Sequence, residues 1–225
     1  MDDYFKVPPT PEGPLEYAIK TKQYNVAKYL LDKNMVDKKN APLILLWVQP
    51  ENYQDMIDFF KIDLTTKIDK AGSSILHVAT SKRNMDLVDF LLKNNFDVNT
   101  LDDYNHTALF YAVIPTVFKI DWESPVIEDE TIAKLNLGGR GIYPSQFHPL
   151  VTFGDGIFCG MLVDAGINVN QQNKAGWTVL HFLVATYKTP NWSLANILDK
   201  IAKDINLDLK TNYGRTAMDI HTLME

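Results

Sequence analysis

The stretch GSSILHVA at residues 72–79 decides the fold because its pattern returns along the chain. Leu109 in YNHTALFYAV follows Leu76 by 33 residues, and Leu43 in KNAPLILLWV precedes Leu76 by the same interval. A fixed period of this length indicates an array of stacked repeats. AGWTVLHFLV with Leu180 is an equally good copy, and weaker ones are PEGPLEYAI with Leu15 and NYGRTAMDI at 212–220.

The second half of each repeat has a helical period. Segments such as NMDLVDFLLKNNFDVN and CGMLVDAGINVN carry apolar residues at i, i+3 and i+4 and then run into a short polar turn. This is the spacing of an amphipathic helix, and strand alternation is absent from it. We therefore predict two helices per repeat and an all-α fold.

Each repeat also carries turn and capping residues at fixed places. A hydroxyl residue just before the first helix can accept a hydrogen bond from an unpaired backbone N–H. Two residues earlier stands Gly or Asn, which tolerate positive φ. Small Ala residues indicate a close approach of two helices. The hydroxyl residues are Ser74, Thr107, Thr178 and Thr216; the turn residues are Gly72, Asn105, Gly176 and Gly214; the alanines are Ala79 and Ala112.

This pattern resembles the ankyrin repeat family, which has a turn, a T-P-L-H-x-A helix start and a second helix ending in L-L. The resemblance implies an all-α solenoid of about five to six helix-pair repeats with a long insertion inside the fourth. The predicted organisation is an N-terminal extension (1–12) and a single ankyrin-repeat domain (13–225), with repeats near 13–38, 39–68, 69–101, 102–172, 173–210 and a truncated cap at 211–225.

The resemblance also assigns structural roles to polar residues that invite a catalytic interpretation. In the family, the histidine that corresponds to His77 and His181 hydrogen-bonds neighbouring loops. Arg83 stands where the family has Gly between the helices, so we expect an exposed turn residue. The acidic pair Asp102-Asp103 lies at a repeat turn and is expected to be solvated.

The second repeat is more apolar than an ordinary inner helix. Its run continues from Leu43 to Trp47, and Pro50 is expected to close that helix early. Trp47 either belongs to the core or points outward toward a partner.

A segment of about 114–155 separates the two predicted helices of the fourth repeat, the second of which resumes near Ile157. A loop this long is uncommon in compact domains. Four readings stay open: a partner-recognition loop, a loop packed over the helices, a phosphate cradle at GGRG (138–141), and a metal site with His148 and Asp155. GGRG lacks the Lys-Ser/Thr of a P-loop, and the His–Asp pair has no typical ligand spacing.

Composition excludes several functional classes. The chain has 225 residues, 46% of them hydrophobic and 22% charged, which is typical of a globular protein. A net charge of −6 argues against general nucleic-acid binding. The single cysteine, Cys159, excludes an intrachain disulfide and is expected to be buried and inert. The start, MDDYFKVPPTPEGP, lacks the basic n-region of a signal peptide, and no apolar run is long enough to span a membrane.

No catalytic motif such as G-x-S-x-G, H-E-x-x-H or a P-loop is present. We therefore expect a non-enzymatic module without cofactor or metal that binds another protein through turn tips, the concave inner-helix surface and the insertion. The alternative is an enzyme or enzyme subunit whose active site the 114–155 insertion completes. The expected location is the cytosol or nucleus, or the host cytosol for a pathogen effector. The predicted partner-binding residues are Lys70, Asp103, Tyr104, Trp122, Lys174, Trp177 and Tyr213.

Overall fold

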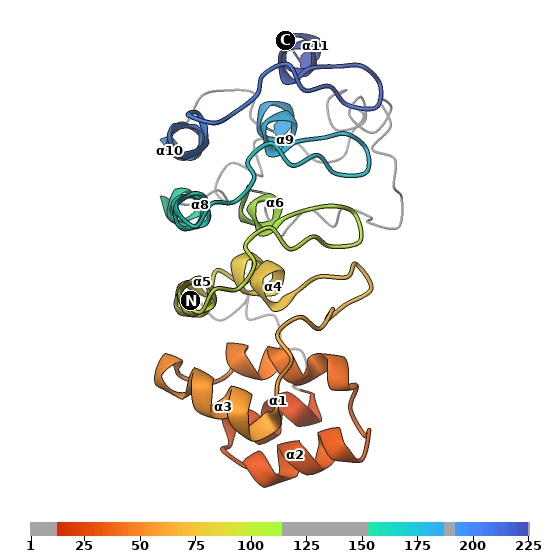
Figure 1. The fold of residues 1–225 in the computed structure, drawn as a ribbon, viewed down its shortest axis with the longest axis vertical. Helices are drawn as coiled ribbons and strands as arrows, with labels where there is room; N and C mark the ends of the chain where they lie inside the picture. Colours follow the sequence, from red (N-terminus) through yellow and green to blue (C-terminus); the bar gives the residue numbers. More distant parts are fainter. Residues whose placement is uncertain (1–12, 114–152, 187–191, 225) are drawn as a thin grey trace, which may run out of the picture. The chain divides into compact units, whose positions relative to one another are not determined.

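The structure of the protein is a computed structural model, and it describes residues 13–113, 153–186 and 192–224. The regular elements in these ranges are all helices (Figure 1), and one isolated antiparallel bridge joins Lys210 to Thr216. None of the helices described is long and apolar enough to cross a membrane. The predicted all-α fold is confirmed.

The chain forms two compact units, Met1–Asp69 (unit 1) and Lys70–Glu225 (unit 2). Their border lies one residue from the predicted border between the second and third repeats. The predicted N-terminal extension and the insertion from 114 to 152 lie outside the described residues. The number of repeats and the single-domain organisation stay predictions.

Unit 1 contains two successive helical pairs, because α1 packs on α2 and η1 packs on α3. Pro14 opens α1, where its fixed φ suits the first helical position and its missing N–H costs no hydrogen bond. The elements are α1 (Pro14–Lys20), α2 (Tyr24–Asp32), the 3₁₀ helices η1 (Lys38–Leu46) and η2 (Pro50–Asn52), and α3 (Tyr53–Phe60).

The inner helix of the second repeat differs from the prediction. It is a 3₁₀ helix that contains Pro42 and ends at Leu46, before Pro50 begins η2. Proline lacks an N–H and clashes with the preceding turn of an α-helix, which favours the tighter 3₁₀ form. Leu43 is half-buried, whereas the next two residues are fully buried, so the core register is shifted here. Trp47 is half-buried and therefore neither a core residue nor fully exposed.

Unit 2 alternates inner and outer helices. Figure 1 shows α4, α6, α9 and α11 following one another in one column and α5, α8 and α10 in a second. α6 packs on α4, α8 and α9, α9 on α11, and α8 on α10. α8 begins four residues before the predicted restart near Ile157. The elements are α4 (Ile75–Ser81), α5 (Met85–Lys93), α6 (Ala108–Val113), α8 (Phe153–Asp164), α9 (Val179–Thr186), α10 (Trp192–Ile201) and α11 (Ala217–Met224).

The predicted core positions on α4 and α6 are confirmed. Leu76 and Leu109 have 0% of their surface exposed, and so do Ala79 and Ala112. The alanines leave no side chain beyond Cβ between neighbouring helices, which explains why the pattern requires a small residue there.

Three of the four predicted helix caps form. The Ser74 hydroxyl accepts from the backbone N–H of His77, and Ser74 N–H donates to His77 Nδ1 at 3.1 Å. Thr178 and His181 repeat both bonds, at 3.5 Å and 3.1 Å. At α11, Thr216 N–H donates to Asp219 Oδ2 and Asp219 N–H donates to Thr216 Oγ1, which is a reciprocal capping box. The prediction for Thr107 is wrong, because its buried hydroxyl has no hydrogen-bond partner in the described structure.

The two histidines have the structural role that the resemblance implies. Because His77 Nδ1 accepts, the proton lies on Nε2, which donates to the His106 carbonyl of the next repeat at 3.0 Å. His181 Nε2 donates likewise to the Arg215 carbonyl at 3.3 Å. Burial lowers the pKa of His181 below its ordinary value, so its ring is neutral near neutral pH.

The predicted turn residues all adopt positive φ: Gly72 at 71°, Asn105 at 63°, Gly176 at 78° and Gly214 at 76°. They differ in the space around them. A Cβ added at Gly176 would lie 2.7 Å from the backbone nitrogen of Asn212, whereas nothing lies within 4 Å of one added at Gly214.

This difference gives a matched pair of variants. Gly214→Ala is expected to cost only the strain of a left-handed Ala, about 1–2 kcal/mol. Gly176→Ala adds a clash with backbone and is expected to cost clearly more. Chemical denaturation of both variants measures the difference, and equal losses would contradict the close approach of the two turns.

The turns after the outer helices are joined by two equivalent asparagines. Asn99 Oδ1 accepts from Asn168 N–H at 2.7 Å, and its Nδ2 donates to the Gly166 carbonyl at 3.2 Å. Asn170 makes the same two bonds with the next turn, at 2.8 Å to Asn206 N–H and 2.7 Å to the Asp204 carbonyl. Each asparagine thus fastens its own repeat to the backbone of the following one.

Candidate partner-binding surface

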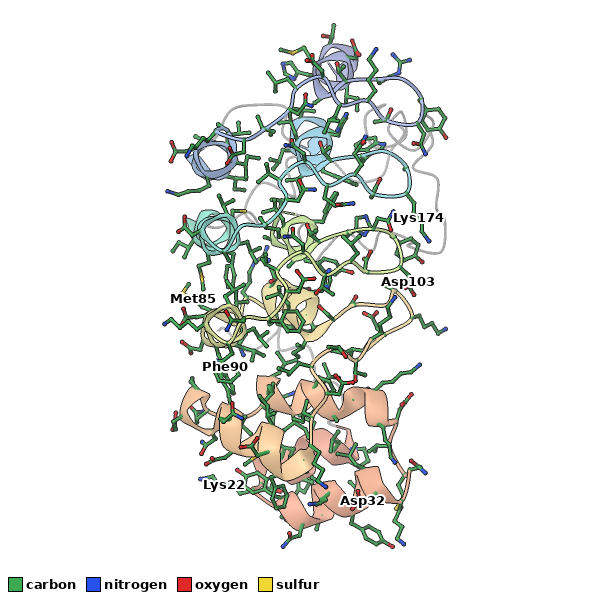
Figure 2. All side chains as sticks on the ribbon, viewed as in Figure 1. Lys22, Asp32, Met85, Phe90, Asp103 and Lys174 are labelled. Carbon is green, nitrogen blue, oxygen red and sulfur yellow. The ribbon has the colours of Figure 1, made fainter. Side chains whose placement is uncertain are left out.

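The turns that precede the inner helices of unit 2 form a row of exposed tips. Asp103 N–H donates to the Ala71 carbonyl at 2.7 Å. In the same way, Lys174 N–H donates to the Tyr104 carbonyl and Asn212 N–H to the Ala175 carbonyl, both at 3.0 Å. Figure 2 shows Asp103 and Lys174 at the ends of neighbouring turns. One backbone hydrogen bond per step thus holds each tip in register with the next.

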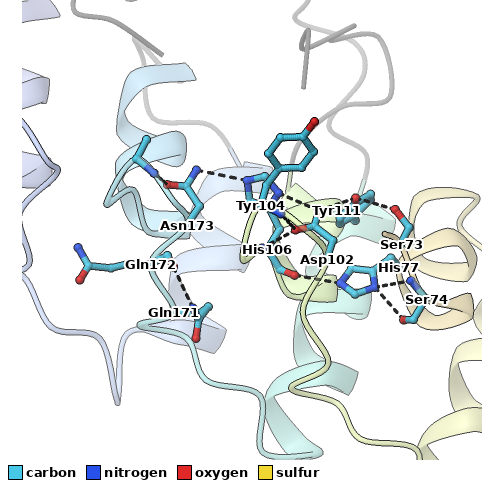
Figure 3. A network of polar contacts seen from close by, with 11 residues as sticks. Ser73, Ser74, His77, Asp102, Tyr104, His106, Tyr111, Gln171, Gln172 and Asn173 are labelled. Atoms are coloured by element: carbon cyan, nitrogen blue, oxygen red, sulfur yellow. Dashed lines mark hydrogen bonds and ion pairs between the residues drawn. The ribbon is translucent and has the colours of Figure 1, made fainter. Parts of the chain in front are cut away.

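A buried aspartate, Asp102, organises the second of these turns (Figure 3). Its Oδ1 accepts from the backbone N–H groups of Tyr104 and His106, both at 2.8 Å. Its Oδ2 accepts from the Tyr111 hydroxyl at 2.9 Å and from His106 Nδ1 at 3.0 Å. One carboxylate therefore satisfies four donors of its own repeat.

The same network reaches the two neighbouring repeats. Tyr111 Oη lies 3.0 Å from the Ser73 hydroxyl in the preceding turn. His106 Nε2 lies 3.2 Å from Asn173 Nδ2 in the following turn. Since His106 Nδ1 donates to Asp102, its Nε2 accepts from the asparagine amide. The contacts therefore tie three successive turns together.

Asp102 corrects the prediction that the acidic pair at 102–103 is solvated. Asp103 is exposed, but only 3% of Asp102 is exposed. Burial by itself raises the pKa of Asp102, but hydrogen bonds from His106 and Tyr111 outweigh it and hold that pKa below its ordinary value of 3.8. The carboxylate is therefore ionised in the folded protein at neutral pH.

Five of the seven predicted partner-binding residues lie in the turn tips. Lys70, Asp103 and Lys174 are exposed, Tyr213 has 47% of its surface exposed, and Tyr104 is half-buried. Trp122 lies outside the described residues.

The prediction for Trp177 as an exposed anchor is wrong, since only 2% of its surface is exposed. Its ring centroid lies 4.9 Å from that of Phe182 and 5.9 Å from that of His181. The repeat register contained the signal, because Ser73 and His106 occupy the same place after the turn residue and are each 1% exposed. Trp177 belongs to the core that supports the tip.

Arg83 also corrects a prediction, that of an exposed turn residue. It is half-buried, and its guanidinium donates three hydrogen bonds to backbone carbonyls, of Thr80 at 2.9 Å, Tyr111 at 3.0 Å and Ala112 at 2.9 Å. The sequence pattern identifies position 83 as a turn, but it does not predict that the side chain binds carbonyl groups of another repeat.

The inner helices themselves offer little free surface. Val78 on α4 and Tyr111 on α6 are half-buried, and the residue at the same place on α9, Phe182, is 8% exposed. The turn tips therefore supply most of the exposed polar and aromatic groups on this side of unit 2.

The described residues hold no group of three or more His, Cys, Asp or Glu side chains that could bind a metal ion. Cys159 is fully buried in α8, as predicted for an inert thiol. The GGRG segment and His148 lie outside the described residues.

Comparisons with known proteins agree with this architecture. Residues 43–117 match a family model described as ankyrin repeats in three copies. The chain is 29% identical over 178 residues to the nuclear factor NF-kappa-B p105 subunit of Gallus gallus, covering 78% of this chain and 17% of that protein. It is 39% identical over 56 residues to the ankyrin repeat protein FPV230 of Fowlpox virus (strain NVSL), covering 25% of this chain and 28% of the relative.

A second fowlpox virus ankyrin repeat protein, FPV034, is 31% identical over 94 residues, which cover 40% of this chain and 22% of that protein. The chain thus spans less than a third of the length of these curated relatives. The 33-residue period, the helix pairs and the matching family model together show that the chain contains ankyrin repeats.

Proposed function

We propose that the chain binds another protein through the turn tips of unit 2, with Tyr104 and Tyr213 as the main aromatic contacts. Ankyrin repeats are general protein-interaction modules, and the observation that carries the proposal is the hydrogen-bonded row of tips. A row fixed by backbone bonds loses little conformational freedom on binding, which favours affinity. Tyrosine is a residue type in which binding energy concentrates at interfaces.

The charges along the row indicate the kind of surface that fits. Lys70 and Lys174 are exposed on either side of Asp103. A partner with the opposite alternation of charge gains complementarity, which mainly sets specificity and the association rate. A uniformly negative polymer such as a nucleic acid would meet the exposed aspartate, so direct nucleic-acid binding is not part of the proposal.

Alanine substitution at the two tyrosines tests the proposal. A partner is first captured from the native cell and identified, and its Kd for the purified chain is then measured. Tyr104→Ala and Tyr213→Ala are each expected to weaken binding about tenfold or more, since interface anchors contribute over about 1 kcal/mol. Tyr29→Ala is the matched control, because Tyr29 is 56% exposed on α2 rather than in a tip. Equal effects of all three substitutions, or none, would reject the tips as the binding surface.

We further propose that the protein works in the cytosol or nucleus, and in the host cytosol if it comes from a pathogen. The support is a single buried cysteine and the two fowlpox virus relatives. Cell fractionation followed by immunodetection tests this location, and recovery from a secreted fraction would contradict it.

A further inference from the structure

The two described helices of the fourth repeat lie much farther apart along the sequence than those of the third. In the third repeat, α4 ends at Ser81 and α5 begins at Met85, so three residues connect them. In the fourth, α6 ends at Val113 and α8 begins at Phe153. Closing a long connection costs only slightly more entropy than closing a short one, so contacts between the helices themselves can hold such a pair together.

Arg83 reaches the C-terminal end of α6 from the turn of the preceding repeat. Nη1 donates to the carbonyls of both Thr80 and Tyr111, and Nη2 donates to Ala112. The last carbonyls of a helix have no partner within it, and a cation there is favoured by the helix dipole. One guanidinium thus caps α4 and α6 together, with the charge-assisted hydrogen bonds that a planar fork provides.

The same guanidinium also contacts the helix on the other side of the insertion. Arg83 Cζ lies 5.7 Å from the centroid of the Phe158 ring, and Phe158 is 2% exposed on α8. A cation over an aromatic face at this distance is attracted to it, more strongly where water is excluded. Arg83 therefore touches both helices that the insertion separates.

Lys22 lies at the corresponding turn position of the first repeat but has no contacts of the kind that Arg83 makes in the described structure. It occupies the same place in the turn between α1 and α2, with φ of 59° against 56° at Arg83. Its side chain is exposed, whereas that of Arg83 is half-buried. Both residues carry the same backbone strain, so a comparison of the two isolates the effect of the guanidinium.

We propose that Arg83 fastens the two helices of the fourth repeat to each other: it holds the end of α6 and the ring of Phe158 on α8 with one side chain. Arg83 is a positioning residue that acts on the helix pair of the fourth repeat.

Amide hydrogen exchange on the full chain tests the proposal. Arg83→Ala is expected to raise exchange at Ala112 on α6 and at Cys159 and Leu162 on α8 at least about tenfold, as loss of a hydrogen bond to a charged group does. The helix α5 begins two residues after Arg83, and exchange at Leu91 on this helix is expected to rise much less. Lys22→Ala is the matched control and leaves α6 and α8 unchanged.

Two outcomes would overturn the assignment. An equal rise on α5 and α8 would mean that Arg83 stabilises unit 2 as a whole rather than the interrupted pair. Full recovery by Arg83→Lys would mean that a charge at the helix end is enough, because an ammonium lacks the planar fork that serves two helices.

A second measurement uses the insertion itself. In a chain with residues 114–152 replaced by a three-residue turn, the short covalent connection itself holds α6 and α8 together, which is the role that we assign to Arg83. Arg83→Ala is then expected to lower the denaturation midpoint less in the shortened chain than in the full one. Equal shifts in both chains would contradict the proposal, and the exchange experiment on the full chain decides independently of this comparison.

Discussion

Replacing Leu109 with alanine is expected to lower the free energy of unfolding by about 2–5 kcal/mol. Leu109 is fully buried on α6, which packs on α4, α8 and α9. The substitution removes apolar surface from the core and leaves a cavity that close-packed neighbours fill only in part. Because stability in a repeat array depends on contacts between neighbours, a cavity in a central repeat weakens the interfaces on both sides. Urea denaturation followed by circular dichroism measures the loss.

Met218 provides a control at the same place in another repeat. It stands two residues after the capping Thr216, as Leu109 stands two residues after Thr107, but 69% of its surface is exposed. Met218→Ala is therefore expected to change stability by less than about 0.5 kcal/mol. A loss below about 1 kcal/mol for Leu109→Ala would mean that the assigned register is wrong.

Replacing Asp102 with alanine is expected to cost about 3 kcal/mol or more. The carboxylate accepts from two backbone N–H groups, the Tyr111 hydroxyl and His106 Nδ1, and the alanine variant removes the acceptor that these four donors share. Each buried donor left unsatisfied costs about 1–3 kcal/mol, although water that enters the site offsets part of this. Because the network touches three turns, amide exchange is expected to rise at all of them.

Asp102→Asn is expected to destabilise the protein less than Asp102→Ala, because the fifth repeat has an asparagine at the corresponding place. Asn173 Oδ1 accepts from the N–H groups of Ala175 and Trp177 at 3.0 and 2.9 Å, as Asp102 Oδ1 does in its own turn. Asp102→Asn therefore keeps the two backbone hydrogen bonds of the turn but replaces Oδ2, the acceptor for Tyr111 and His106, with an amide that cannot accept. Its loss of stability is expected to be smaller than that of the alanine variant. If the alanine and asparagine variants were equally unstable, the contacts of Oδ2 rather than the backbone bonds of Oδ1 would be what the turn requires.

The depressed pKa of Asp102 also fixes the sign of a pH effect. Because the unfolded chain binds this proton more readily, with a pKa near 3.8, the carboxylate stabilises the fold fully above that pH. The contribution is lost as the pH falls through the lower pKa of the folded state. The stability of Asp102→Asn is therefore expected to fall less steeply than that of the natural chain in acid, as denaturation at a series of pH values measures.

Features that depend on one repeat alone could be predicted from the sequence. The positive φ of Gly72 and Asn105 follows from the residue type and its place before a helix, and the caps at Ser74 and Thr178 follow from their own helices. The core position of Leu109 could be predicted as well, because this residue fits both the 33-residue repeat and the apolar spacing of a helix.

Features that depend on a partner in another repeat could not be predicted in the same way. Arg83 bonds to carbonyls 28 and 29 residues away, which no local pattern marks. Trp177 has the residue type of an interface contact, but its register matches the buried Ser73 and His106. Thr107 has the residue type of a cap, but Phe110 takes the place of the histidine that completes the cap at α4 and α9, and the hydroxyl is left without a partner.

The bonds of Asn99 and Asn170 have a consequence for how such a chain can change over time. Each amide side chain docks onto main-chain atoms of the following turn, and main-chain atoms are the same whatever side chains that turn carries. A unit that ends in this asparagine can therefore be followed by any unit with a turn of the same shape. Recombination at these two points would exchange whole modules without breaking the fastening between them.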